Sequence, residues 1–163
     1  MTWTMLKPLY LAGPISGLTY EDAVADRHSW EAKQEFKLVG FQGISPLEGY
    51  EELAGQGTLP VMFEEIIEGS AEQAVHADLR MIDASVAVFA NFTRESGPSL
   101  GTAAELGYAF AQGKPIVTLM PDDSVANQHP FVLYLSSHVE TTWNEAMAKL
   151  AAVRESLETL PYA

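Results

Sequence analysis

The chain has 163 residues, a length typical of one domain with its own core. It contains no cysteine, which excludes disulfides, thiolate zinc sites and cysteine nucleophiles. Its net charge of -13 argues against binding to the phosphate backbone of nucleic acids or to anionic membrane surfaces. The opening residues show no signal-peptide pattern and no apolar run approaches a membrane span, so we expect a soluble, cytoplasmic protein with no membrane partner.

The first half of the chain alternates strand and helix signals. A short apolar strand at residues 9–12 ends in the turn Gly13-Pro-Ile-Ser-Gly17. Apolar residues at helical spacing predict one helix from Tyr20 to about Leu38, and residues 41–45 form a second short strand. Residues 47–59 are rich in glycine and acids and are predicted to be irregular.

The second half continues the alternation. A helix is predicted from Pro60 through Leu79, with a break near Gly69-Ser70, before the apolar strand 85–90. A glycine-rich loop and a helix ending at Gly113 follow. The remaining expected elements are a strand at 116–120, a loop at 121–127, a short strand at 138–142 and a closing helix at 144–157.

Strands that alternate with helices indicate an α/β fold built on a parallel sheet. In such sheets, ligands bind beyond the carboxyl ends of the strands. Those ends are followed by the loops 13–17, 46–50, 91–101 and 121–127. The most distinctive loops of the chain are therefore expected at one rim of the sheet.

The glycine-rich loop and its helix contain the most informative stretch, which runs from Ser96 to Val117. Gly97 and Gly101 allow backbone amides to approach a ligand closely, and a helix start offers unpaired N–H groups with a partial positive charge. Glu105 lies in the first turns of this helix. An acid that the helix dipole keeps ionised is a candidate nucleophile.

Asp78, on the helix before the third strand, is a candidate partner for Glu105. We expect Asp78 near the end of its helix, so that both helices border the same strand. Two carboxylates near one sugar are the groups that retaining glycosyl transfer requires. Taken alone, each acid is also typical of a solvated helix face, because the chain has 22 acidic residues.

Other motifs are absent or weak. The chain has neither GxxxxGK[ST] nor a GxGxxG after its first strand, and its four histidines lack zinc-ligand spacing, so we expect no nucleotide cofactor and no metal. Gly97-Pro-Ser-Leu-Gly101 fits the GxSxG elbow of serine hydrolases, with Ser99 as nucleophile. That elbow must directly follow a strand, whereas Thr93–Ser96 intervene here.

Three segments resemble the nucleoside 2-deoxyribosyltransferase family from the first strand to about Met120. They are Tyr10-Leu-Ala-Gly-Pro-Ile-Ser16, Asp78-Leu79, and Gly97-Pro-Ser-Leu-Gly-Thr-Ala-Ala-Glu-Leu-Gly-Tyr-Ala109 with Gly113-Lys-Pro115. The resemblance implies a single flavodoxin-like domain over residues 1–163, with helices on both faces of the sheet. It also implies a homo-oligomer with shared active sites that exchanges the bases of 2'-deoxynucleosides in nucleotide salvage.

Site residues follow from the same resemblance. Glu105 is implied as the nucleophile on C1', Asp78 as the acid that handles the proton of the base, and Tyr10 as the group that orients Glu105. Gly13 would line the sugar side of the rim. Asn127 and His129, after the fourth strand, and Tyr162 near the carboxyl terminus are candidates for reaching a neighbouring subunit's site.

Ser99 departs from the transferase pattern, which often has an acid at this position to bind the sugar 5'-hydroxyl. A serine resembles the related deoxynucleoside 5'-monophosphate N-glycosidases, because a hydroxyl beside open helix N–H groups accommodates a phosphate. Those enzymes tend to carry a basic residue where this chain has Ser16. The N-glycosidase therefore stands as the alternative, followed by a non-catalytic nucleotide-binding module.

Overall fold

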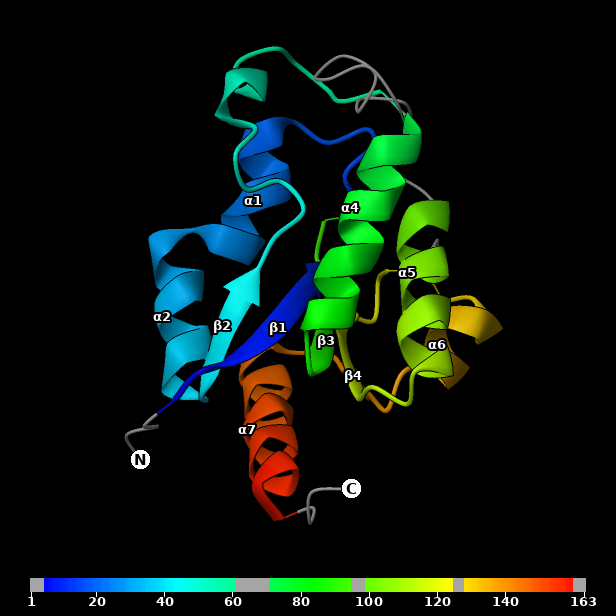
Figure 1. Ribbon diagram of the computed structural model, residues 1–163. Helices are drawn as coiled ribbons and strands as arrows, with labels where there is room; N and C mark the ends of the chain where they lie inside the picture. The colour runs from blue at the N-terminus through cyan, green and yellow to red at the C-terminus, as the bar shows by residue number, and fades with distance from the viewer. Residues whose placement is uncertain (1–4, 61–70, 95–98, 125–127, 160–163) are drawn as a thin grey trace.

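Five parallel strands form the single sheet of the computed structural model, which describes residues 5–60, 71–94, 99–124 and 128–159 (Figure 1). The strands are β1 (Lys7–Ala12), β2 (Phe41–Ile44), β3 (Ala87–Asn91), β4 (Ile116–Leu119) and β5 (His138–Glu140). They lie in the order β2-β1-β3-β4-β5. This is the flavodoxin-like order, so the predicted fold class is confirmed.

Helices cover both faces of the sheet. In the described part of the chain they are α1 (Tyr20–His28), α2 (Trp30–Leu38), α4 (Ala71–Ala84), α5 (Leu100–Ala111), α6 (Pro130–Leu135) and α7 (Trp143–Thr159), with a short 3-10 turn η1 (Glu51–Leu53). Helices α2 and α7 pack on one face, whereas α4, α5 and α6 pack on the other.

The side chains of β1 alternate between these two cores. Leu9 and Leu11 pack with α2 and α7, and Tyr10 and Ala12 pack with α4 and α5. This alternation follows from the two-residue period of a strand. Because both faces are covered, β1 and β3 are buried along most of their length and read as continuous apolar runs.

The expected helix 20–38 is wrong in one respect, because Ser29 divides it into α1 and α2. Ser29 has an extended backbone, and its Oγ accepts a hydrogen bond from the amide of Ala32 at 3.2 Å. A serine in this geometry is a helix N-cap, which ends α1 and begins α2. The apolar spacing continues across the break and therefore conceals it.

Two further helices differ from expectation. Helix α4 continues past Leu79 to Ala84, so Asp78 lies in its middle rather than near its end. The expected break at Gly69-Ser70 lies outside the described residues. Helix α6 was not predicted: it is only six residues long, begins with Pro130, and is capped by the side chain of His129.

The order of connections reverses between β1 and β3. The chain leaves β1 toward the β2 edge and leaves β3 toward the β4 edge. Ligands of doubly wound sheets bind at this switch point, beyond the carboxyl ends of the strands. The loops that follow Ala12 and Asn91 therefore border the expected site.

Candidate active site

A buried tyrosine on the central strand contacts the candidate nucleophile. Tyr10 is fully buried in β1, and its hydroxyl donates a hydrogen bond to Oε1 of Glu105, on α5, at 2.7 Å. Ninety-five positions separate the two residues in the sequence. The structure thus brings together two residues that only the family resemblance had linked.

Burial raises the pKa of the Tyr10 hydroxyl well above its ordinary value. The negative charges of Glu105 and Asp78 act in the same direction, and the positive charge of Arg27 opposes them. The hydroxyl therefore stays neutral and keeps the proton that it donates to Glu105. The effect of Asp78 on Tyr10 also shows that this second acid lies within electrostatic reach of the pair.

Asp78 is half-buried on α4, which runs beside α5 on the same face of the sheet (Figure 1). Glu105 is half-buried as well. Two acids on neighbouring helices thus act on the Tyr10 hydroxyl, Glu105 through a hydrogen bond and Asp78 through its charge. Although Asp78 lies further from the end of its helix than predicted, α4 still holds it in this group.

The start of α5 places the half-buried hydroxyl of Ser99 beside the buried hydroxyl of Thr102. Ser99 caps the helix: its Oγ lies 2.7 Å from Oγ1 of Thr102 and accepts the Thr102 amide at 3.4 Å. A side chain at Gly101 would meet no protein atom within 4 Å. Since β3 ends at Asn91, Ser99 is not on the sharp strand-to-helix turn that an esterase nucleophile needs.

Gly13, after β1, has a packing reason to be glycine. Its φ is +151°, and a Cβ there would lie 2.5 Å from the Asn91 carbonyl oxygen and 2.6 Å from Nη2 of Arg27. Any side chain would displace the start of the loop. Ser16 lies half-buried further along this loop, where the amide of Gly17 donates to the carbonyl of Leu59 at 2.7 Å.

Arg27 is the residue near the rim that sequence reasoning missed. It is 4% exposed, and its guanidinium donates to the carbonyl of Pro14 at 3.0 Å and to the carbonyl of Ala23. Within the single helix predicted from Tyr20 to Leu38, an arginine at position 27 is expected to be solvated on the outer face. The sequence offered one signal, the Gly13-Pro14 turn. In the structure, the guanidinium of Arg27 occupies the space that a side chain at position 13 would need.

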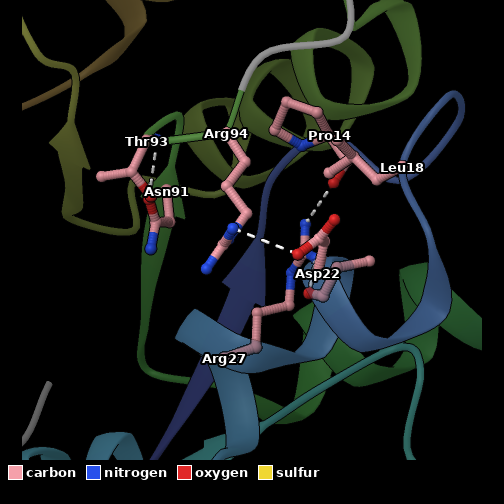
Figure 2. A pocket seen from close by; sticks show the side chains of 8 residues that line it. Pro14, Leu18, Asp22, Arg27, Asn91, Thr93 and Arg94 are labelled. Atoms are coloured by element: carbon pink, nitrogen blue, oxygen red, sulfur yellow. Dashed lines mark hydrogen bonds and ion pairs between the residues drawn. The ribbon is translucent and has the colours of Figure 1, made fainter.

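Figure 2 shows the small pocket beside Arg27, where the loops after β1 and β3 meet α1. Arg94 forms an ion pair with Asp22 across this pocket at 3.1 Å. The amide and hydroxyl of Thr93 both donate to Oδ1 of Asn91, at 2.9 and 2.7 Å. The ion pair joins α1 to the loop that leads from β3 toward α5, and the bonds of Thr93 hold the start of that loop.

The family model described as nucleoside 2-deoxyribosyltransferase matches residues 9–152. The chain belongs to this family.

Solved structures agree with this assignment at the level of the fold. A conserved protein from Enterococcus faecalis V583 is 17% identical, covers 90% of this chain and 98% of its own, and has a TM-score of 0.62. A 2-deoxyribosyltransferase from Bacillus psychrosaccharolyticus is 22% identical (88% and 95% covered, TM-score 0.57). A CMP N-glycosidase from Clostridium botulinum is 17% identical (90% and 98% covered, TM-score 0.53). No curated protein sequence gives a significant match.

The other sequence candidates lie outside the described residues or at the start of α6. Asn127 and Tyr162 fall outside the described residues. His129 is exposed, caps α6 through Nδ1 and stacks on Phe131 with ring centroids 5.8 Å apart. Within the described ranges, no group of three or more histidines and acids could hold a metal ion. No helix there is long and apolar enough to cross a membrane.

Proposed function

We propose that this family member is a nucleoside 2-deoxyribosyltransferase, which exchanges the base of 2'-deoxynucleosides through a deoxyribosyl ester of Glu105. The carrying observation is the 2.7 Å hydrogen bond from the Tyr10 hydroxyl to Oε1 of Glu105. A neutral donor on one carboxylate oxygen fixes the direction of the carboxylate and leaves the other oxygen to react. Family membership supports the substrate class.

In the first half of the reaction, a carboxylate oxygen of Glu105 forms a bond to C1' as the bond from C1' to the base nitrogen breaks. The electron pair of that bond goes to the base, which receives a proton from Asp78. The transition state resembles an oxocarbenium ion, and the missing 2'-hydroxyl makes this cation easier to form.

The second half reverses these events. An incoming base attacks C1', its proton passes to Asp78, and the Glu105 carboxylate is released. Water in place of the base gives hydrolysis, so the outcome depends on how well the closed site excludes water. Gly13, Ser16, Ser99 and Gly101 contact the sugar in this proposal, because they border the rim beside Tyr10 and Glu105.

One observation favours a second function, that of a 2'-deoxynucleoside 5'-monophosphate N-glycosidase. At the start of α5, this chain has the half-buried hydroxyl of Ser99, 2.7 Å from that of the buried Thr102, in place of a transferase acid that would repel a phosphate. Helix N–H groups and hydroxyls together suit a phosphate group. In this case water completes the cycle and the product is deoxyribose 5-phosphate.

The site also requires a partner in this proposal, namely a second copy of the chain. Phe131 and Tyr134 on α6 are 68% and 84% exposed, next to the capping residue His129. Aromatic side chains left this exposed are typical of interfaces. Light scattering measures the oligomeric state. A second experiment mixes an inactive Glu105 variant with an inactive variant of the α6 surface and tests whether activity is restored across subunits.

The decisive experiment traps the covalent intermediate. The enzyme is incubated with a slow, 2'-fluorinated arabinonucleoside and digested, and mass spectrometry locates the added sugar, which we expect on Glu105. Continuing turnover without any adduct would contradict the proposal. Deoxyadenosine and its 5'-monophosphate, each with and without an acceptor base, separate the functions: exchange indicates the transferase, and release of sugar phosphate regardless of acceptor indicates the N-glycosidase. A nucleotide-binding module gives neither product.

A further inference from the structure

Lys114, in the connection from α5 to β4, caps the end of a different helix. Its Nζ donates to the carbonyl oxygens of Asp83 at 2.9 Å and Ser85 at 2.6 Å, and also to that of Ile82. These carbonyls belong to the last turn of α4 and the residue after it. Carbonyls in a last helical turn have no partner within the helix, so the ammonium group supplies one.

A second set of contacts joins the same end of α4 to α5. Oδ1 of Asp83 accepts hydrogen bonds from the Tyr108 hydroxyl at 2.9 Å and from Nε2 of Gln112 at 2.7 Å. These donors lower the pKa of the Asp83 carboxyl, and the charge of Lys114 adds to the effect. We refer to Asp83, Tyr108, Gln112 and Lys114 as the α4–α5 tie.

The tie lies close to both candidate catalytic acids. Asp78 precedes Asp83 by five positions, or about 7.5 Å along α4, and Glu105 precedes Tyr108 by three positions, or about 4.5 Å along α5. Both acids lie on the side of the tie that faces the ligand rim, because α4 and α5 both begin there (Figure 1). A slip of one helix along the other therefore changes the spacing of the two carboxylates directly.

Apolar packing alone does not hold such a register. Leu79, Met81 and Ala103 pack between the helices and the sheet, and hydrophobic contact is non-directional. Hydrogen bonds from Tyr108 and Gln112 to one carboxylate oxygen require a defined axial position. The tie thus supplies a directional restraint between the two helices.

We propose that the α4–α5 tie is a positioning device, with Lys114 as its anchor, that holds the helix of Asp78 in register with the helix of Glu105 for glycosyl transfer. The inference rests on the proposed function. Displacement of a catalytic group by about 1 Å can cost up to 10²-fold in rate. Loss of the tie therefore lowers kcat, whereas substrate binding at the rim is retained.

The test compares Lys114→Met with Arg154→Met. Arg154 on α7 also donates to main-chain carbonyls, those of Gly40 at 3.2 Å and Met5 at 3.1 Å, but it lies with the opposite layer of helices. We expect kcat of Lys114→Met to fall about tenfold with KM within about twofold. Arg154→Met loses at least as much thermal stability and keeps kcat within about twofold. Lys114→Arg, which retains the cation, recovers most of the loss.

A readout that needs no turnover accompanies the kinetics. Carbon-13 NMR titration follows the carboxyl groups of Asp78 and Glu105, whose pKa values depend on their separation. We expect both titrations to shift in Lys114→Met and to stay unchanged in Arg154→Met. Tyr108→Phe, which removes only one hydroxyl, gives a smaller shift in the same direction and a decrease in kcat of about threefold.

The outcomes separate the inference from the proposed function. If Lys114→Met and Tyr108→Phe lose no more kcat than Arg154→Met and the two titrations do not move, the positioning role is overturned while the proposed function stands. If the wild-type protein converts neither deoxynucleosides nor their 5'-monophosphates, the proposed function fails and the inference fails with it.

Discussion

Polar side chains are buried in two regions of this protein, and they donate hydrogen bonds to different kinds of acceptor. Between β1 and α5, the Tyr10 hydroxyl donates to the carboxylate of Glu105. On α1, Arg27 is 4% exposed and donates to main-chain carbonyls. A carbonyl of the main chain only accepts the bond, whereas a carboxylate can also react. The first region is therefore suited to chemistry and the second to holding the loops and strands together.

The largest expected effect is on the reacting carboxylate. Glu105→Gln keeps the size of the side chain and removes the nucleophile, so we expect kcat for base exchange to fall on the order of 10⁴-fold. Glu35→Gln on the exposed surface of α2 is the matched control and should retain wild-type activity. If Glu105→Gln exchanged bases as fast as the wild type, the carboxylate that accepts from Tyr10 would have no role in the chemistry.

Tyr10→Phe tests whether the buried hydroxyl serves the chemistry. The ring still fills the core, but the Glu105 carboxylate loses the hydrogen bond from the tyrosine hydroxyl. A hydrogen bond to a charged group contributes about 1.5–3 kcal/mol, so we expect kcat to fall roughly 10–100-fold. Tyr20→Phe removes the hydroxyl of another buried tyrosine, which packs in a different core cluster from Tyr10, and should change kcat less than twofold. Equal losses in the two variants would contradict the role of Tyr10.

Arg27→Met tests the structural region. The carbonyl of Pro14 loses a buried donor, so we expect the free energy of unfolding to fall by about 2 kcal/mol. Urea denaturation measures this loss. Arg80→Met, at an exposed position of α4, serves as the control and should lie within about 0.5 kcal/mol of the wild type. An unchanged denaturation midpoint for Arg27→Met would show that the guanidinium is dispensable.

Alkaline stability sharpens the comparison. The pKa of Tyr10 is raised in the folded protein, so its neutral form is favoured there, and the stabilisation is complete below the ordinary pKa of about 10. Above that pH the unfolded chain releases the proton and the folded chain retains it. Between pH 10 and 11 the wild type should therefore lose about 1 kcal/mol more stability than Tyr10→Phe. Parallel curves for the two proteins would contradict the shift.

The smallest effect concerns the break between α1 and α2. Ser29→Ala removes the cap on the Ala32 amide and should lower the free energy of unfolding by about 1 kcal/mol without changing kcat. Ser156→Ala, at an exposed position of α7, should leave stability within about 0.5 kcal/mol of the wild type. A cost as small as that of Ser156→Ala would mean that packing, rather than the cap, ends α1.

Local patterns were sufficient to predict a parallel α/β sheet, and the family resemblance added its flavodoxin-like type. The apolar runs that became β1, β3 and β4 are covered on both faces, which makes them continuous in the sequence and easy to identify. Short elements were harder, because α6 contains too few residues to show a helical period. The division at Ser29 was missed because one side-chain cap, rather than hydrophobicity, decides it.

The candidate site was predictable only in part. The glycine-rich helix start identified Glu105 and Ser99 as candidates, and the family resemblance indicated the roles of Asp78 and Tyr10. The buried position of Arg27 depends on the backbone of Gly13, a contact across 14 positions that periodicity does not encode. The tie of Lys114 to the end of α4 spans more than 30 positions and is likewise a property of the folded arrangement.

The bond between Tyr10 and Glu105 has a consequence for how activity is acquired. It joins residues 95 positions apart, one on β1 and one on α5. Long-range contacts of this kind carry the entropy cost of closing a large loop. The Tyr10 hydroxyl and the Glu105 carboxylate are therefore aligned only where β1 and α5 are packed together.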